Sequence, residues 1–423
     1  MPPTVRSFST SRNEIAGFTI SEIAERFGTP CYVYDWESIA QRIADLRAFD
    51  AVRYAQKALS NIAILDRMRR SGVVVDAVSA GEIERALRAG FVPGSQPSEI
   101  VYTADVFDHA ALELVVKHNI PVNIGSPIMI DQLGDVAPGR NIALRINPGF
   151  GHGHSQKTNT GGAQSKHGIW HTDIDECLIR ADRNNLAVTG MHMHIGSGTD
   201  FEHLAQVCGA MEQACLTVGR TVRTISAGGG LPIPYTADQT YIDLEQYYQL
   251  WDATRQHLQD KFGHAIELEI EPGRYLVAES GYLIAEIRAI KAMGENTFYL
   301  LDAGFNDLAR PILYGAYHPI SIARRDGHTT QLEQDVVVGG PLCESGDIFT
   351  QEEGGFVARR RLPSAAVGDY LILEVAGAYG YAMASNYNSK YRPPEVLIEG
   401  GQLKQIRRRE TADDLLRLES IPE

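Results

Sequence analysis

Eight short runs rich in β-forming residues alternate with amphipathic segments between residues 52 and 274, and this alternation constrains the fold more than any other feature. The expected strands are 52–57, 73–79, 100–103, 122–126, 142–148, 188–197, 224–230 and 266–274. The expected helices include Ile62 to Arg70, Gly81 to Ala89, Asp105 to His118, Leu204 to Val218 and Leu244 to Phe262. Because parallel strands need such crossovers, the pattern predicts an α/β fold of the (β/α)8 TIM-barrel type. An open doubly wound sheet shares the periodicity, but no G-x-G-x-x-G turn follows the first run.

After Gly281 the pattern changes to strands without helices between them. The expected strands are Tyr282 to Ile290, Thr297 to Asp302, Asp335 to Val338, Tyr370 to Val375, Glu395 to Ile398 and Gln402 to Arg407. Cys31 to Asp35 is also strand-like, and we expect it to complete this second domain. The predicted organisation is an N-terminal segment 1–36 that joins the β domain, a barrel 37–281 and a C-terminal β domain 282–423. Thr411 is expected to cap a short terminal helix.

Composition excludes several classes of protein. The formal net charge of −14 argues against nucleic-acid binding, and the short arginine runs 359–361 and 407–409 are expected to be solvated faces. No stretch has the apolar length of a membrane span, and no signal-peptide pattern opens the chain. The five cysteines form no C-x-x-C pair and are odd in number, which predicts reduced thiols and a cytoplasmic location. Four of them are expected to be buried, whereas Cys343 lies in a polar, glycine-bounded loop.

Polar residues and glycines collect where the eight expected strands end. In α/β barrels the carboxyl ends of the strands form one rim, which carries the active site. The residues at this rim are Lys57, Asp76, Ser79, Asn147, His194, Ser197, Gly228, Gly229, Gly230, Glu271, Pro272, Gly273 and Arg274. Their coincidence at one rim predicts an enzyme site.

Lys57 and the triple glycine 228–230 indicate a phosphate-bearing carbonyl cofactor. We expect the Lys57 ammonium to be desolvated at the barrel mouth, which lowers the pKa of an amine and makes it nucleophilic toward carbonyls. Glycines expose backbone N–H groups, and barrels commonly bind phosphate after strands seven and eight. A lone lysine more often snorkels or pairs with a carboxylate, and glycines also make tight turns. The combination of the two favours a site.

Glu271 and Arg274 share one turn at the end of strand eight. A carboxylate against a pyridine nitrogen keeps that nitrogen protonated, and an arginine beside it can bind a carboxylate or phosphate. A simple Glu–Arg ion pair is the alternative. His192 and His194 alternate along strand six, so we expect one to face the barrel or its mouth and the other to face the helices.

Two other functions compete at this point. The H-x-H of strand six is compatible with a metal-dependent hydrolase, for which Asp76 and the histidines of the loop 149–168 (His152, His154, His167) are candidate ligands. Strands seven and eight, however, end in glycines and Glu-Pro-Gly-Arg rather than in ligands. The other alternative is a binding protein that has lost its chemistry, against which the presence of both Lys57 and Cys343 argues.

Several motifs in order give the chain a specific resemblance over essentially its whole length. They are Tyr54-Ala55-Gln56-Lys57-Ala58, His194-Ile195-Gly196-Ser197, Gly228-Gly229-Gly230, Glu271-Pro272-Gly273-Arg274, Arg310-Pro311-Ile312-Leu313-Tyr314, Cys343-Glu344-Ser345-Gly346-Asp347 and Gly377-Ala378-Tyr379-Gly380. The sequence resembles the diaminopimelate decarboxylase family, in the alanine-racemase-like fold group of pyridoxal-phosphate enzymes. His167, where many relatives carry an aromatic residue, and Leu231-Pro232 depart from the pattern.

The resemblance implies roles for individual residues. Lys57 would carry pyridoxal 5′-phosphate, His194 would stack on its ring, and Glu271 would face its pyridine nitrogen. The implied cofactor-binding residues are Lys57, Asp76, His194, Ser197, Gly229, Gly230, Glu271, Gly273, Arg274 and Tyr379. The implied substrate-binding residues are Arg274, Arg310, Tyr314, Glu344 and Tyr379. Cys343 would be the proton donor, so the implied catalytic residues are Lys57, His194 and Cys343, with no metal.

The implied reaction is decarboxylation of meso-2,6-diaminopimelate to L-lysine, the last step of lysine biosynthesis. Related racemases place an arginine against the pyridine nitrogen, so Glu271 favours a decarboxylase. The far end of this substrate carries an ammonium and a carboxylate, which Glu344 and Arg310 would match. Ornithine, arginine and carboxynorspermidine decarboxylases of the same fold remain alternatives. The expected partners are a small amino acid and a second copy of the chain, in a homodimer with shared sites.

Overall fold

The computed structural model describes residues 8–95, 98–151, 161–194, 200–352 and 354–422. The chain forms two compact units. The barrel unit consists of residues 42–232 and 241–276. The β unit consists of the N-terminal segment up to residue 41, the stretch 233–240 and everything from residue 277 onward. The stretch 233–240 therefore clusters with the β unit, although the sequence places it between two barrel strands.

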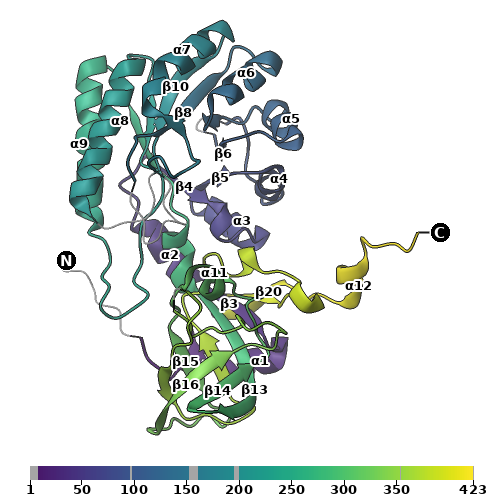
Figure 1. Cartoon of the computed structure of the whole chain (residues 1–423). Coiled ribbons are helices and arrows are strands. Elements are labelled where there is room, and N and C mark those ends of the chain that lie inside the picture. The colour runs from purple at the N-terminus through teal and green to yellow at the C-terminus, as the bar shows by residue number, and fades with distance from the viewer. Residues whose placement is uncertain (1–7, 96–97, 152–160, 195–199, 353, 423) are drawn as a thin grey trace. The chain divides into compact units, whose positions relative to one another are not determined.

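Eight parallel strands close the barrel (Figure 1). In chain order they are β4 (Ala51–Ala55), β5 (Val74–Ala77), β6 (Ile100–Ala104), β7 (Val122–Ile124), β8 (Asn141–Asn147), β10 (Ala187–His192), β11 (Thr224–Ser226) and β12 (Glu267–Ile270). Each pairs with the next in parallel, β12 pairs with β4, and β10 pairs directly with β8, which completes the ring. The predicted barrel is confirmed. A two-residue strand, β9 (Ile169–Trp170), also pairs with β8 in parallel.

Helices follow the barrel strands, and five of the seven in the described structure begin at a side chain that accepts a backbone N–H of the first turn. They are α3 (Ile62–Arg70), α4 (Ala80–Arg88), α5 (His109–Lys117), α6 (Pro127–Val136), α7 (Ile174–Arg183), α8 (Phe201–Val218) and α9 (Leu244–Phe262). In α9, for example, the buried positions recur every three or four residues at Tyr247, Trp251, Leu258 and Phe262, and the Asp243 side chain accepts the N–H of Gln246. Helices α6 and α7 were not predicted.

The β unit is built on a nine-stranded sheet. Its strands are β3 (Cys31–Asp35), β13 (Gly281–Met293), β14 (Asn296–Leu301), β15 (Ile320–Ala323), β16 (Glu333–Gly339), β17 (Arg360–Pro363), β18 (Tyr370–Leu373), β19 (Glu395–Glu399) and β20 (Gln402–Arg407). Strand β3 lies between β13, to which it is antiparallel, and β19, to which it is parallel. The N-terminal segment therefore completes the β domain, as predicted. Strands β15 and β17 were not predicted.

The rest of the β unit consists of short elements. The strands β1 (Glu14–Ile15) and β2 (Phe18–Thr19) pair with each other, and the helices are α1 (Ile20–Phe27) and α11 (Arg310–Tyr314). Helices α2 (Trp36–Ala44) and α10 (Arg274–Val277) lie where the chain passes between the units. The terminal helix α12 (Ala412–Leu416) begins at Thr411 with a capping box, which confirms the predicted cap.

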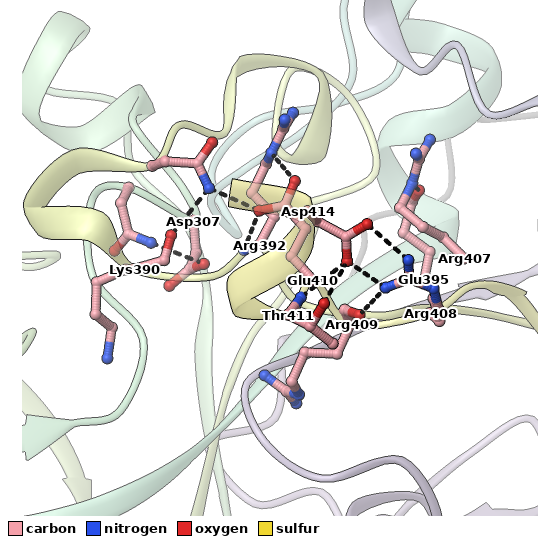
Figure 2. Close-up of polar contacts among 12 residues, drawn as sticks. Asp307, Lys390, Arg392, Glu395, Arg407, Arg408, Arg409, Glu410, Thr411 and Asp414 are labelled. Atoms are coloured by element: carbon pink, nitrogen blue, oxygen red, sulfur yellow. Dashed lines mark hydrogen bonds and ion pairs between the residues drawn. The ribbon is translucent and has the colours of Figure 1, made fainter. Parts of the chain in front are cut away.

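The arginine run 407–409 holds the C-terminal segment in place rather than forming a free basic face. Arg408 pairs with Asp414 (Figure 2). Arg407 donates to the fully buried carboxylate of Glu395, and Arg409 donates to the backbone oxygen of Pro30. Each guanidinium is thus committed to an intramolecular acceptor. The expectation that this run is a solvated face is wrong for Arg407, which is only partly exposed and lies over the Tyr381 ring.

Two further expectations concern the whole chain. Cys31, Cys177, Cys208 and Cys215 are buried and Cys343 is exposed, as predicted. None of the helices in the described part of the chain combines the length and apolar character that crossing a membrane requires.

Candidate active site

Lys57 stands at the mouth of the barrel. It lies in a single 3-10 turn, Gln56–Ala58, that follows β4 directly. The neighbouring Ala55 and Ala58 are buried, but Lys57 itself is exposed, so the expected desolvation of its ammonium is not found in the chain alone. An exposed amine at the end of a barrel strand is accessible to an incoming carbonyl compound.

Glu271 follows β12 and is buried inside the barrel, where His192 at the end of β10 contacts it. Nε2 of His192 lies 2.6 Å from Oε2 of Glu271, and Nδ2 of Asn123 lies 3.4 Å from Oε1. Burial alone would raise the pKa of Glu271, but the electrostatic attraction and hydrogen bond of His192 lower the pKa to about 2. The carboxylate is therefore ionised across the physiological range.

The expectation that His192 and His194 face opposite sides of strand six is wrong. His192 contacts Glu271, and His194 is close enough to the same carboxylate to be attracted by it. Residues two apart in a strand point to the same face, so both histidines belong to the interior and mouth of the barrel. Only the residue between them, Met193, alternates to the other side.

Asp76 at the end of β5 is a second buried carboxyl group near Glu271. Burial and the like charge of Glu271 raise the pKa of Asp76 to about 8. The two groups therefore divide their roles, since Asp76 holds a proton at neutral pH whereas Glu271 holds a charge. Within the described residues, Oδ1 of Asp76 and Nδ1 of His192 are buried without a hydrogen-bond partner. Such orphaned polar atoms beside an ionised carboxylate are typical of a site that receives a polar ligand.

His194 is a neutral imidazole with a defined acceptor nitrogen. The backbone N–H of Gly229 donates to Nδ1 of His194 at 2.8 Å, which leaves the ring proton on Nε2. Burial, together with the positive charges of Arg145 and Lys57, keeps the pKa of His194 well below its usual value. A neutral ring at the mouth suits stacking on a flat heteroaromatic ligand.

The triple glycine is required by packing as well as by any ligand. A Cβ at Gly228 would lie 2.2 Å from the backbone oxygen of Met193, and one at Gly229 would lie 2.4 Å from that of Glu271. Gly228 and Gly230 also have φ values of +63° and +98°. Since the Gly229 N–H is directed to His194, this group is committed within the protein. Gly273 is buried in the turn after β12, and Ser197 lies outside the described residues.

The barrel interior contains polar residues that the sequence analysis missed. Nδ2 of Asn123 donates to Oγ1 of Thr103 at 2.8 Å, which joins the ends of β7 and β6 beside Glu271. Deeper in the barrel, Arg53 forms a two-pronged pair with Glu269 at 3.0 and 2.6 Å. Glu269 lies two residues before Glu271, and that spacing is the signal that would have found it.

The long loop 149–168 is anchored at both of its described ends. Asn147, at the end of β8, accepts the N–H groups of Gly149 and Gly162 and donates to the backbone oxygen of His167. Asp105 accepts from the Gly168 N–H and contacts Nδ1 of His167 at 2.7 Å. His167 is thus an anchor of the loop. His152 and His154 lie outside the described residues.

The remaining predicted site residues belong to the β unit. Arg310, the first residue of α11, is buried, and Tyr314 at the end of the same helix is exposed. Tyr379 has a φ of +58°, an uncommon backbone conformation for a residue with a side chain. Arg274, by contrast, lies with Lys57 in the barrel unit, at the start of α10.

Cys343 and Glu344 are exposed in a loop whose backbone is tightly held. The Cys343 N–H donates to Oδ1 of Asn388 at 2.8 Å, and the Leu342 N–H donates to Asp347 at 2.7 Å. Glu410 fixes the turn that carries Asn388, because its carboxylate accepts hydrogen bonds from the side chain of Asn386 and from Arg392. Figure 2 shows the contact between Glu410 and Arg392. An exposed thiol on a fixed backbone is accessible to a ligand.

These features fit pyridoxal phosphate. The barrel unit supplies an exposed amine, an ionised carboxylate with a protonated neighbour, a neutral imidazole and a glycine turn that admits no Cβ. Within the described residues, no three histidine, cysteine or acidic side chains gather as metal ligands would.

Comparisons with known proteins identify the family of the chain. Residues 37–278 match the family model described as "Pyridoxal-dependent decarboxylase, pyridoxal binding domain". Diaminopimelate decarboxylase of Escherichia coli K12 is 54% identical over 416 residues, which cover 98% of this chain and 99% of that protein. The Streptomyces coelicolor enzyme of the same name is 52% identical over 407 residues, covering 96% and 92%.

Solved structures extend the likeness to three dimensions. A crystal structure of a diaminopimelate decarboxylase superimposes with a TM-score of 0.92 at 55% identity, covering 94% of this chain and 95% of the other. The Helicobacter pylori diaminopimelate decarboxylase, solved in complex with L-lysine, gives a TM-score of 0.82 at 31% identity, covering 94% and 98%. The chain therefore belongs to the diaminopimelate decarboxylase family of pyridoxal-dependent decarboxylases.

Proposed function

We propose that this chain converts meso-2,6-diaminopimelate to L-lysine and carbon dioxide with pyridoxal 5′-phosphate as cofactor. The observation that carries the proposal is the ionised, buried Glu271 held by His192 in the same barrel mouth as the exposed Lys57. The family membership and the relatives' names support the substrate. When bound, the cofactor supplies an electron sink for the pair left on Cα after carbon dioxide departs.

In the barrel unit, Nζ of Lys57 would hold the cofactor through its aldehyde carbon, and Glu271 would stabilise a proton on its pyridine nitrogen. The pKa of about 2 suits Glu271 to this role, because a carboxylate that stays ionised stabilises a cation beside it. His194 packs against the ring as a neutral imidazole, and Asp76 and Gly273 complete the pocket. Ser197, Gly230 and Tyr379 would hold the phosphate, and Gly229, whose N–H is bonded to His194, would line the turn beside them.

In the β unit, Arg310 binds the carboxylate at the far end of the substrate and Glu344 binds the far ammonium. Tyr314 and Tyr379 add contacts to the substrate, as does Arg274 from the barrel. The Cys343 thiol delivers a proton to Cα after decarboxylation. Burial of Arg310 favours this assignment, since a buried guanidinium is strongly attracted to a carboxylate that enters its surroundings.

We further propose a homodimer in which the barrel of one subunit receives Cys343 and Glu344 from the other. This arrangement explains why an exposed cysteine loop is held so rigidly, since a residue that serves a partner's site must keep its position. The five unpaired thiols favour a cytoplasmic location for the dimer.

The test is a parallel product assay with holoenzyme on meso-diaminopimelate, ornithine, arginine and carboxynorspermidine. We expect lysine and carbon dioxide in equal amounts from the first substrate, with kcat/KM at least two orders of magnitude higher than for the others, because a site built for a polar group rejects ligands that lack it. Preference for ornithine or arginine would assign the chain to another decarboxylase of this fold.

A further inference from the structure

One terminal nitrogen of the Arg310 guanidinium donates a hydrogen bond to a histidine, His318. The Nη1 atom of Arg310 lies 2.8 Å from Nε2 of His318, and both side chains are buried. Arg310 begins helix α11, and His318 lies just before β15, so the contact joins two consecutive elements of the β unit. An arginine donates from every nitrogen, so Nε2 of His318 must be an acceptor.

The other ring nitrogen of His318 fixes this tautomer. Nδ1 lies 3.0 Å from the backbone oxygen of Glu374, and a carbonyl oxygen can only accept. His318 therefore carries its proton on Nδ1 and presents the lone pair of Nε2 to Arg310. Both contacts are satisfied only by the neutral imidazole, because a protonated ring has no lone pair for the guanidinium and would repel its charge.

A second ring confines the same guanidinium. The Tyr235 ring centroid lies 5.0 Å from Cζ of Arg310, and the Tyr235 and His318 rings meet edge to face at 5.7 Å between centroids. Arg310 is thus stacked against one aromatic ring and hydrogen-bonded by another. Such a guanidinium has little rotational freedom left, so its position does not depend on a ligand.

The acceptor behind His318 is itself fixed. The Glu374 carboxylate is buried and receives two hydrogen bonds from Arg12, at 2.8 and 3.1 Å, and one from Oγ of Ser321 at 2.8 Å. Its negative charge is therefore compensated by Arg12 and not by His318. Glu374 directly follows strand β18, so its backbone oxygen is held by the sheet. The hydrogen bonds that run from this oxygen through His318 to Arg310 therefore begin at a fixed point.

We propose that His318 is the positioning residue of Arg310 and that, as a neutral imidazole, it holds the guanidinium ready for the far carboxylate of the substrate. The proposal rests on the proposed function of Arg310. It predicts that substrate binding weakens when His318 is protonated, whereas chemistry at the barrel mouth is unaffected. The charged or titratable groups around His318 include Arg310 and Tyr235 and, behind the Glu374 backbone, the Glu374 carboxylate with Arg12.

The test uses two holoenzyme variants of His318. One removes the hydrogen-bond acceptor for Arg310, and the other keeps an acceptor that cannot be protonated. His318→Leu keeps an apolar volume but removes the acceptor, and we expect KM to rise about ten-fold with kcat within about two-fold, because a hydrogen bond to a charged group is lost. His318→Gln can place Oε1 near the position of Nε2 and cannot be protonated. It should restore KM at pH 8. It should also abolish the increase in KM that the proposal predicts for wild type as the pH falls toward 5.5. His328→Leu, at an exposed histidine of the same unit, is the matched control and should leave KM unchanged.

A double-mutant cycle shows whether His318 acts through Arg310. In an Arg310→Ala background, His318→Leu should raise KM no further, and L-lysine binding measured by titration calorimetry should follow the same pattern. An equal increase in both backgrounds, or a loss confined to kcat, would overturn the proposal. If wild type does not act on meso-diaminopimelate, the proposed function fails instead, and the same cycle on the amino acid that the enzyme does use decides the role of His318.

Discussion

Nε2 of His192 lies 2.6 Å from Oε2 of Glu271 in the interior of the barrel, and both side chains are buried. This contact, together with the one to Asn123, fixes the carboxylate at the end of β12. A buried carboxylate would normally take up a proton, and His192 prevents this. The relationship explains how the site can keep a negative charge in a place that water does not reach.

Replacement of Glu271 by Gln should leave the hydrogen-bonding shape of the site but remove its charge. Without that charge the pyridine nitrogen of the cofactor loses its proton, so kcat should fall on the order of 100-fold, as for other preorganised electrostatic contacts. The holoenzyme spectrum should also change. Both are measured directly, by steady-state kinetics and absorbance.

The matched control is Glu267→Gln, an exposed position at the other end of the same strand. It should keep wild-type kcat and spectrum. If Glu271→Gln behaves like this control, the carboxylate has no part in the chemistry and serves only to pair with His192.

Asp76→Asn tests the divided protonation of the two carboxyl groups through stability. An aspartate in an unfolded chain has a pKa near 4, whereas burial and Glu271 raise the pKa of Asp76 in the folded chain to about 8. Between these values folding takes up a proton, so the contribution of Asp76 to stability decreases as the pH rises through this window. Cofactor-free Asp76→Asn should therefore melt higher than wild type by a few degrees at pH 8 and by less at pH 5. An advantage that is largest at pH 5 would contradict the assignment.

The sequence predicts the barrel well because each strand and helix has a strong local signal. Helices α3 and α9 begin and end at the predicted residues, since both have an apolar stripe and a capping side chain at Asn61 or Asp243. Helix α6 was missed because Pro127 and the internal Gly134 weaken its pattern.

The sequence predicts the site only in part. It shows which residues lie at the ends of strands, but it does not show which of them contact one another across neighbouring strands. Lys57, Glu271 and His194 were found by position, whereas the contact of His192 with Glu271 depends on the closure of the barrel. In the same way, nothing in the sequence indicates that His318 accepts from Arg310, because the tautomer depends on the backbone of Glu374, 56 residues away. Ring tautomers and buried charges follow from tertiary structure.

Cys343→Ala should slow turnover and change the partition of products. Without the thiol, part of the protonation after decarboxylation should occur on the cofactor, which accumulates as pyridoxamine phosphate. The by-product is measured by chromatography of the released cofactor. Cys215→Ala, at a buried cysteine of α8, should lower stability slightly and leave the partition unchanged. A normal rate without pyridoxamine phosphate in Cys343→Ala would assign the proton to another group.

Subunit exchange tests the proposed sharing of sites. Lys57→Ala protein, which we expect to be inactive, and Cys343→Ala protein, which we expect to be slow, are mixed under conditions that allow exchange, and pull-down of a tag confirms mixed dimers. About one quarter of the wild-type activity should return, because half of the dimers are mixed and each has one intact site. Confirmed exchange without activity would mean that each subunit builds its own site.

The central claim is that Lys57, at the mouth of this barrel, carries pyridoxal phosphate. Reduction of the holoenzyme with borohydride, followed by proteolysis and mass spectrometry, tests it most directly, because reduction makes the bond between Nζ and the cofactor permanent. We predict the reduced pyridoxyl phosphate on the peptide that contains Lys57, and no labelled peptide from Lys57→Ala. Label on another lysine, or an active wild-type enzyme without any labelled peptide, would contradict the account.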